Sequence, residues 1–278
     1  MKLTKTRRRW VNERQRATIK GSKLAYPAAP AARFDAALQR MVNQMLKAYR
    51  SELETALAAG PVTLDASIAT LARRALAGLK SRFDRLFSTN ARSLTDNLFG
   101  QIDKASAGNL KASLKELSGG ITLATPKMPA SLAETMKAAT ASNVSLIKSI
   151  PAQFHEKIEG AVLRSIQPGG NGLQDVFEAL AKQEGITQRR AKFIAEDQTR
   201  KATTAMNSAR MQSSGVKQFE WIHSGGGAEP RRLHLKLHGQ TFSFDDLPVI
   251  DERTGERGLP GQLPNCRCTL RPVLNFGE

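Results

Sequence analysis

Four side chains near the end of the chain are of types that bind metal ions or act as nucleophiles. His234 and His238 are four residues apart, so on a helix they would share one face. Cys266 and Cys268 are two apart, so on a strand both thiols would point to the same side. Two imidazoles and two thiolates form a tetrahedral zinc site in many proteins. One hypothesis is therefore a structural zinc site.

A second hypothesis is catalysis by the same residues. His234 with Asp245 or Asp246 could form a hydrolytic pair, and Cys266 could be a nucleophile with a histidine as its base. Neither arrangement has a supporting local motif, and a catalytic function needs residues with defined geometric roles. The sequence therefore predicts no catalytic residue.

A third hypothesis makes the two thiols small buried side chains in a compact core, where free cysteines are common. On this interpretation His234 hydrogen-bonds a nearby loop and His238 precedes a turn at Gly239. The Cys-x-Cys spacing is tighter than the usual Cys-x2-Cys pair of zinc sites, and Gly239 indicates that a helix ends near His238. This interpretation is favoured, so the sequence predicts no metal ligand and no cofactor, with structural zinc as the alternative.

The elements that would position these residues follow a long helical region. Apolar residues recur every three or four positions over 34–57, and Gly60-Pro61 ends that helix. Asp65 is a suitable N-cap for a second helix reaching Leu86, and residues 94–102 and 110–117 predict two further stretches. We also expect helices over 131–150, from Pro151 to 166, over 173–184 and over 187–214. The last two are separated at Gly185, and Gly215 closes the second.

The pattern changes after residue 215 to short alternating runs between glycine- and proline-rich loops. Strands are expected at 218–222, 240–244 and 268–274. The predicted fold is mainly α, a long helical N-terminal body with a small C-terminal α+β module. The predicted domains are a basic flexible arm and linker (1–30), an N-terminal helical region (31–130), a second helical part (131–215) and the C-terminal module (216–278).

Positive charge is concentrated at the N-terminus. The chain carries 42 Lys and Arg against 25 Asp and Glu, a net charge of +17. Such a basic segment attracts polyanions, and double-stranded DNA, bound without sequence specificity, is the expected partner. A solubilising tail, or docking on an acidic protein surface, is the alternative. No apolar run is long enough to cross a bilayer, so we expect no membrane partner. The predicted DNA-binding residues are Lys2, Lys5, Arg7, Arg8, Arg9, Arg14, Arg16, Lys20 and Lys23.

Two stretches of the chain resemble the phage Mu F-like minor head protein family, over about residues 140–275. The first resembles the family's helical run through Asn207 and Arg210 to Gly215. The second is similar to the family's ending and contains the predicted structural motif. The helical run is Ile194-Ala195-Glu196-Asp197-Gln198-Thr199, Asn207, Ala209-Arg210, Gly215 and Phe219-Glu220-Trp221. The motif residues are Arg232, His234, His238, Gly239, Pro264, Asn265, Cys266, Arg267 and Cys268.

This resemblance implies a virion protein, a low-copy minor capsid component that acts in head assembly, genome packaging or genome delivery. The implied partners are the portal protein, around which several copies could sit, the major capsid protein and packaged DNA. The implied location is the phage head, assembled in the host cytoplasm. An alternative is a metal-dependent enzyme that acts on nucleic acid and is carried in the head.

The chain departs from the family pattern at two positions. Many members have a cysteine where Arg231 stands and a histidine where Leu263 stands. If the family's module holds a metal ion, two potential ligands are absent here, and a closed structural zinc site needs four. The departures therefore favour the structural interpretation of the motif.

Overall fold

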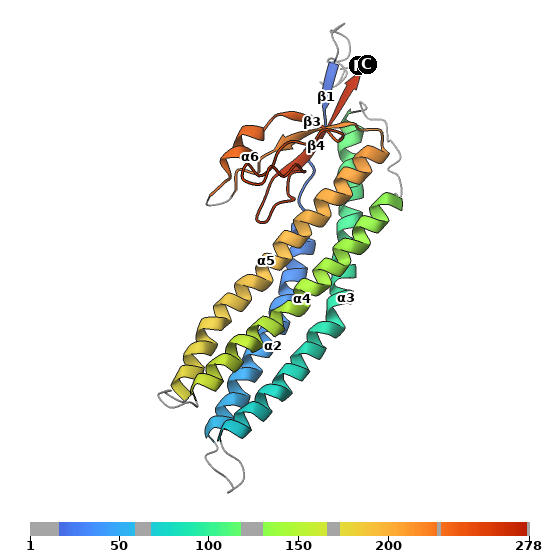
Figure 1. Cartoon of the computed structure of the whole chain (residues 1–278). Coiled ribbons are helices and arrows are strands. Elements are labelled where there is room, and N and C mark those ends of the chain that lie inside the picture. Colours follow the sequence, from blue (N-terminus) through green and yellow to red (C-terminus); the bar gives the residue numbers. More distant parts are fainter. Residues whose placement is uncertain (1–16, 59–67, 118–129, 166–172, 227–228, 277–278) are drawn as a thin grey trace. The chain divides into compact units, whose positions relative to one another are not determined.

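The fold is mainly helical with one small sheet, as the sequence predicts. A computed structural model describes residues 17–58, 68–117, 130–165, 173–226 and 229–276 (Figure 1). Its helices are α2 (Ala28–Ala58), α3 (Ile68–Leu117), α4 (Ala130–Ser165), α5 (Leu173–Ser213) and α6 (Arg232–Leu237). Its strands are β1 (Ala17–Lys20), β2 (Gln218–Ile222), β3 (Thr241–Ser243) and β4 (Thr269–Phe276). None of the described helices is long and apolar enough to cross a membrane.

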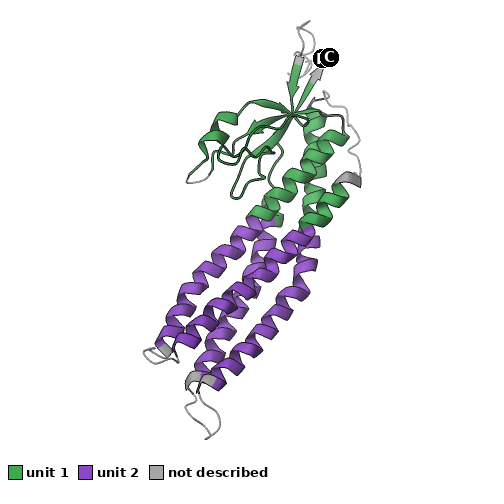
Figure 2. Cartoon of the chain, in the orientation of Figure 1, with its two compact units in different colours: residues 1–30, 99–139, 197–278 green, residues 31–98, 140–196 purple. Residues whose placement is uncertain are grey.

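The chain divides into two compact units, whose boundaries differ from the predicted domains (Figure 2). Unit 1 comprises residues 1–30, 99–139 and 197–278, and unit 2 comprises 31–98 and 140–196. The predicted domains are continuous in sequence, whereas α3, α4 and α5 each contribute to both units. Segments that are distant in sequence pack together in each unit. The order of the residues along the chain does not show which segments do so.

Unit 2 is a bundle of four helical segments around Tyr49 of α2. The Tyr49 ring lies 4.9 Å from Phe154 of α4 and 5.9 Å from Phe83 of α3, measured between ring centroids. Its hydroxyl is 3.0 Å from Nδ1 of His155, and burial lowers the pKa of that imidazole. The fourth helix, α5, is joined through Gln188, whose carbonyl accepts a hydrogen bond from Gln39 at 2.9 Å.

Helix α3 is a single helix of 50 residues, where the sequence analysis predicted three separate stretches. The physical reason lies in its buried stripe, which continues through Ala91, Thr95 and Ser106. These small and polar residues keep the helical spacing, but a search for large apolar side chains passes over them. The buried hydroxyl of Thr95 donates a hydrogen bond to the carbonyl of Ala91 at 2.8 Å, so the helix accommodates this polar side chain.

Two predicted helix breaks are also wrong. Helix α4 runs through Pro151 and α5 runs through Gly185. Proline inside a helix costs about 3 kcal/mol and glycine about 1 kcal/mol. The buried side chains of Ile147, Ile150 and Phe154 offset the cost of the proline. Burial of each large apolar side chain contributes about 1.5–3 kcal/mol to stability. Tertiary packing therefore outweighs local preference at this site.

Unit 1 contains a four-stranded antiparallel sheet in the order β1-β4-β2-β3. The three strands predicted in the C-terminal module are present. The fourth strand, β1, lies within the predicted flexible arm, so residues 17–20 are not a flexible segment. Leu24, four residues later, is 1% exposed in the unit 1 core, and its amide donates to the carbonyl of Leu270 at 2.9 Å.

The end of α5 leads directly into the sheet through the predicted glycine. Gly215 has φ +79°, and its amide donates to the carbonyl of Gln212 at 3.0 Å. The next amide, of Val216, donates to the carbonyl of Met211 at 3.0 Å. This pair of bonds is the Schellman arrangement that ends many helices. It places β2 in the core that also holds the motif residues.

Candidate functional site

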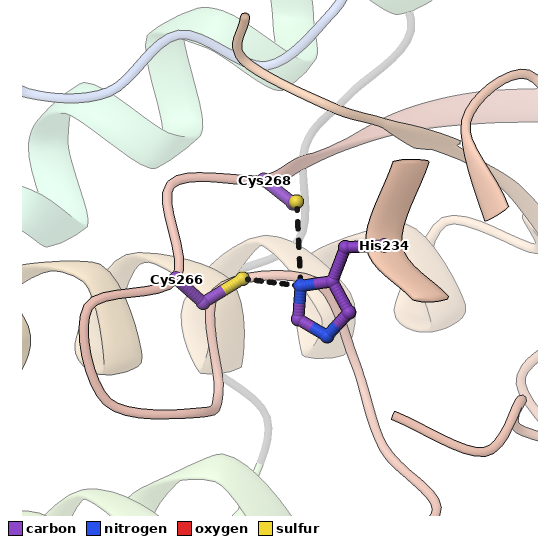
Figure 3. A group of neighbouring side chains, drawn as sticks. All are labelled: His234, Cys266 and Cys268. Atoms are coloured by element: carbon purple, nitrogen blue, oxygen red, sulfur yellow. Dashed lines mark hydrogen bonds between the residues drawn. The ribbon is translucent and has the colours of Figure 1, made fainter. Parts of the chain in front are cut away.

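Three of the four predicted ligand-type residues come together in the core of unit 1 (Figure 3). Nδ1 of His234 lies 3.4 Å from Sγ of Cys266 and 3.8 Å from Sγ of Cys268. The exposed fractions are 3%, 3% and 7%. The short helix α6 presents His234, and the segment that enters β4 presents both cysteines. The site is therefore a buried junction between two segments that are far apart in sequence.

The opposite nitrogen of the His234 ring fixes the state of the imidazole. Nε2 lies 3.0 Å from the carbonyl oxygen of Ile250, which can only accept a hydrogen bond. Nε2 therefore carries the proton, and the lone pair of Nδ1 faces the two sulfur atoms. The indole of Trp221 packs edge-on against the ring at 5.0 Å between centroids and restricts its rotation.

A tight turn over residues 263–266 positions Cys266. The amide of Cys266 donates to the carbonyl of Leu263 at 3.0 Å, and Asn265 between them has φ +59°. Proline at the second position and a residue with positive φ at the third are the requirements of a type II turn. Pro264 and Asn265 meet both requirements, which explains why this residue order precedes Cys266.

Asn265 gives a prediction about this turn. Replacement of Asn265 by valine should lower the free energy of unfolding by about 1–2 kcal/mol, because β-branched residues resist positive φ. Asn265→Gly should leave the stability equal or higher, since glycine adopts this conformation without strain. Urea denaturation of the two variants checks this, and equal stability of both would contradict the role assigned to the turn.

Gly261 contributes to the site, although nothing in the sequence motifs singles it out. Its φ is +88°, and its amide donates to Sγ of Cys266 at 3.3 Å. A Cβ atom there would lie 2.7 Å from Oγ1 of Thr204 and 3.3 Å from the carbonyl oxygen of Cys268. The Leu259-Pro260-Gly261 run is a turn signal, but only the fold shows that α5 crowds this residue.

The two thiols differ in acidity because they face each other. The hydrogen bond from Cys268 holds the pKa of the Cys266 thiol well below its usual value, with a smaller contribution from the Gly261 amide and with burial opposing the shift. The same hydrogen bond, together with burial, raises the pKa of Cys268. The pair therefore favours one shared negative charge over two.

The remaining predicted ligand, His238, lies outside this cluster. It is exposed at the C-cap of α6, and its Nδ1 accepts the amide hydrogen of His223 at 3.1 Å. The zinc site with two histidines and two cysteines is therefore not formed by the described residues. The hydrolytic pair is not formed either, because both nitrogens of His234 face other groups and Asp246 pairs with Arg257 at 2.5 Å.

The other motif residues surround the junction. Gly239 has φ +81°, and its amide donates to the carbonyl of Trp221 at 2.8 Å, which ties α6 to β2. Arg232 begins α6 and is exposed, as are Pro264 and Arg267.

At the two positions where the chain departs from the family pattern, other interactions are present. The Arg231 guanidinium donates to the carbonyl of Pro264 at 3.0 Å, and Leu263 is buried in the core. Both positions still contribute to the turn that carries Cys266.

The helical part of the motif joins α5 to α3 inside unit 1. Oγ of Ser106 donates to Oδ1 of Asn207 at 2.7 Å, and both side chains are buried. One turn further along α5, Arg210 forms an ion pair with Asp103. The asparagine and the arginine that carry the sequence resemblance therefore hold α3 and α5 together within unit 1.

Most of the predicted DNA-binding residues lie outside the described residues, namely Lys2, Lys5, Arg7, Arg8, Arg9, Arg14 and Arg16. Of the other two, Lys23 is exposed, and Lys20 of β1 is 3.3 Å from the buried carboxylate of Glu220. Arg271 of β4 approaches the same carboxylate at 3.2 Å. Lys20 therefore has a structural partner within the sheet.

Comparison with known proteins agrees with the sequence motif. Residues 156–271 match the family described as phage Mu protein F like protein. An uncharacterized protein of Haemophilus influenzae is 27% identical over 246 residues, which cover 86% of this chain and 53% of that protein. The uncharacterized protein YqbB of Bacillus subtilis is 28% identical over 130 residues, 44% of this chain and 42% of that protein. The chain thus spans about half the length of these curated relatives. No solved structure matches.

Proposed function

We propose that this chain, whose residues 156–271 form a phage Mu protein F-like region, is a minor structural protein of a tailed-phage head. The family match carries this proposal. The buried motif residues, His234, Cys266, Cys268, Asn207 and Arg210, lie in unit 1, where they connect α3, α5, α6 and the segment that enters β4. Side chains that hold a fold together suit an assembly component, and the chain would act in head assembly and in packaging or delivery of the genome.

The chemistry of the site supports a structural role over an enzymatic one. A nucleophilic cysteine has to meet its substrate, yet Cys266 is 3% exposed and its sulfur faces His234 and the Gly261 amide. The imidazole has no free nitrogen for general base catalysis. These contacts stabilise a fold and offer a substrate no approach.

We further propose the portal protein as the direct partner, with the major capsid protein adjacent and several copies of this chain around the portal. Co-expression with the portal and the major capsid protein of the same phage, followed by affinity purification, tests this. We expect this chain to be retained with the portal through gel filtration. Retention with the capsid protein alone, in the absence of portal, would contradict the assignment of the portal as the partner.

The basic N-terminal segment is proposed to contact packaged DNA through its phosphates. The test has to spare β1, since deleting residues 17–20 would remove a strand. We therefore substitute glutamine for the seven basic residues at positions 2–16. DNA affinity should fall, and the slope of log K against log salt should flatten by up to about 0.9 for each lost contact.

A matched control removes seven positive charges from exposed helical positions of unit 2. If the N-terminal segment is the contact, this control should keep a steeper salt slope than the segment variant. Equal slopes in the two variants would show that net charge alone attracts the DNA and would contradict the proposed contact. The control positions are Arg40, Lys47, Arg73, Arg74, Arg85, Lys148 and Lys192.

A further inference from the structure

We propose that His234, Cys266 and Cys268 are three protein ligands of a Zn²⁺ ion whose fourth ligand is water. This site differs from the one considered in the sequence analysis, because it excludes His238 and needs only three side chains. It is independent of the proposed role in the phage head, so either proposal can fail alone.

The separations between the donor atoms agree with a tetrahedral ion. Zinc binds thiolate sulfur at about 2.3 Å and imidazole nitrogen at about 2.0–2.1 Å, which at the tetrahedral angle places the two ligand atoms about 3.6 Å apart. The two nitrogen–sulfur distances, 3.4 and 3.8 Å, lie on either side of that value. All three donor atoms lie within 4.8 Å of one another. The spacing of the three donor atoms therefore fits a single tetrahedral ion.

The state of the imidazole also agrees with metal binding. A ligating histidine commonly donates its other ring N–H to a carbonyl, which orients the ring and fixes the tautomer. Nε2 of His234 has such a partner in the carbonyl of Ile250 at 3.0 Å. The lone pair of Nδ1 can accept only one S–H hydrogen, although both sulfur atoms face it. A cation uses the lone pairs of all three atoms at once.

Hydrogen-bond donors lie close to the sulfur atoms. The Gly261 amide donates to Cys266 at 3.3 Å. The indole of Trp221 is fully buried and interacts with Cys268, yet its Nε1 has no hydrogen-bond partner among the described residues. A buried N–H without a hydrogen-bond acceptor is unfavourable. Ionisation of Cys268 by a bound cation would give this N–H a stronger acceptor.

The ion would hold α6 against the start of β4. His234 is the buried polar residue of a six-residue helix, which is too short to be stable alone. The cysteines belong to an irregular segment between Gly258 and Thr269. Coordination by His234, Cys266 and Cys268 would hold α6 and the cysteine segment together, and the fourth position of the ion, which no described side chain fills in this proposal, would be taken by water.

Metal analysis of the purified full chain, reconstituted with Zn²⁺ and separated from unbound ion, tests the proposal. We expect about one zinc ion per chain, and at least about a tenfold lower content in Cys266→Ser and His234→Asn. The matched control is His238→Gln, an exposed histidine four residues away, which should retain the ion. Zinc content in the wild-type chain no higher than in Cys266→Ser would overturn the proposal.

Cobalt substitution and thiol labelling keep the test decisive where a buried variant fails to fold. Co²⁺ bound to the wild-type chain should show sulfur-to-metal charge transfer and the intense visible bands of a tetrahedral site. Native Cys266 and Cys268 should react with a thiol reagent faster after a chelator is added. Cobalt binding without the charge-transfer band, or thiol labelling unaffected by the chelator, would show that the sulfur atoms are not ligands.

Discussion

Replacement of Trp221 by alanine should lower the free energy of unfolding of unit 1 by about 3–5 kcal/mol, which is the range for removing a large aromatic side chain from a core. Trp221 is fully buried on β2 and packs against His234. Its backbone also pairs with Gly239 and Gln240, so its side chain fills the space between the sheet and α6.

Hydrogen exchange of peptides from β2 and β4 measures this effect within unit 1, apart from the stability of unit 2. Leu235→Ala provides the control, since Leu235 lies on α6 but is 46% exposed and should change stability by no more than about 0.5 kcal/mol. A loss below about 1 kcal/mol for Trp221→Ala would contradict the described core.

The second large effect is expected at Gly261. Gly261→Ala should cost about 2–4 kcal/mol, because alanine adds both the strain of a positive φ and a steric clash. The clash is with Oγ1 of Thr204, which already donates to the carbonyl of Pro260 at 2.7 Å and cannot move freely. The added Cβ would also lie in tight contact with the carbonyl oxygen of Cys268, at 3.3 Å. The variant should also weaken the amide hydrogen bond to Cys266.

The variant Gly255→Ala separates the cost of the positive φ from the cost of the steric clash. The φ of Gly255 is +71°, but a Cβ atom there would meet nothing within 4 Å. Gly255→Ala should therefore cost only the conformational term, about 1 kcal/mol. Urea denaturation of both variants gives the comparison, and equal losses would mean that the contact with Thr204 does not constrain Gly261.

The positions of the helices and strands could be predicted from the sequence more accurately than their lengths. Among the residues that the structure describes, apolar spacing located each long helix and the three C-terminal strands, because burial on one face leaves a clear period. It divided α3 because Ala91, Thr95 and Ser106 continue the buried stripe without being large or apolar. It also ended helices at Pro151 and Gly185, where local cost is visible in the sequence but compensating tertiary contacts are not.

The candidate site was predicted in composition and only partly in geometry. The motif identified His234, Cys266 and Cys268, but spacing alone also grouped His238 with them. The two histidines lie apart because α6 ends at Leu237, and the His238 side chain accepts a hydrogen bond from the amide of His223. The partners that fix the site, Ile250 and Gly261, are recognised only once the chain is folded.

The central claim, a structural role in the phage head, is tested most directly by quantitative mass spectrometry of purified phage heads. Heads from the phage that encodes this chain are compared with heads from a variant that has an early stop codon in its gene. The account predicts a few copies of this chain in each wild-type head, fewer than the major capsid protein, and defective heads or DNA content in the variant. Absence of the chain from wild-type heads, with normal DNA-filled heads from the variant, would contradict it.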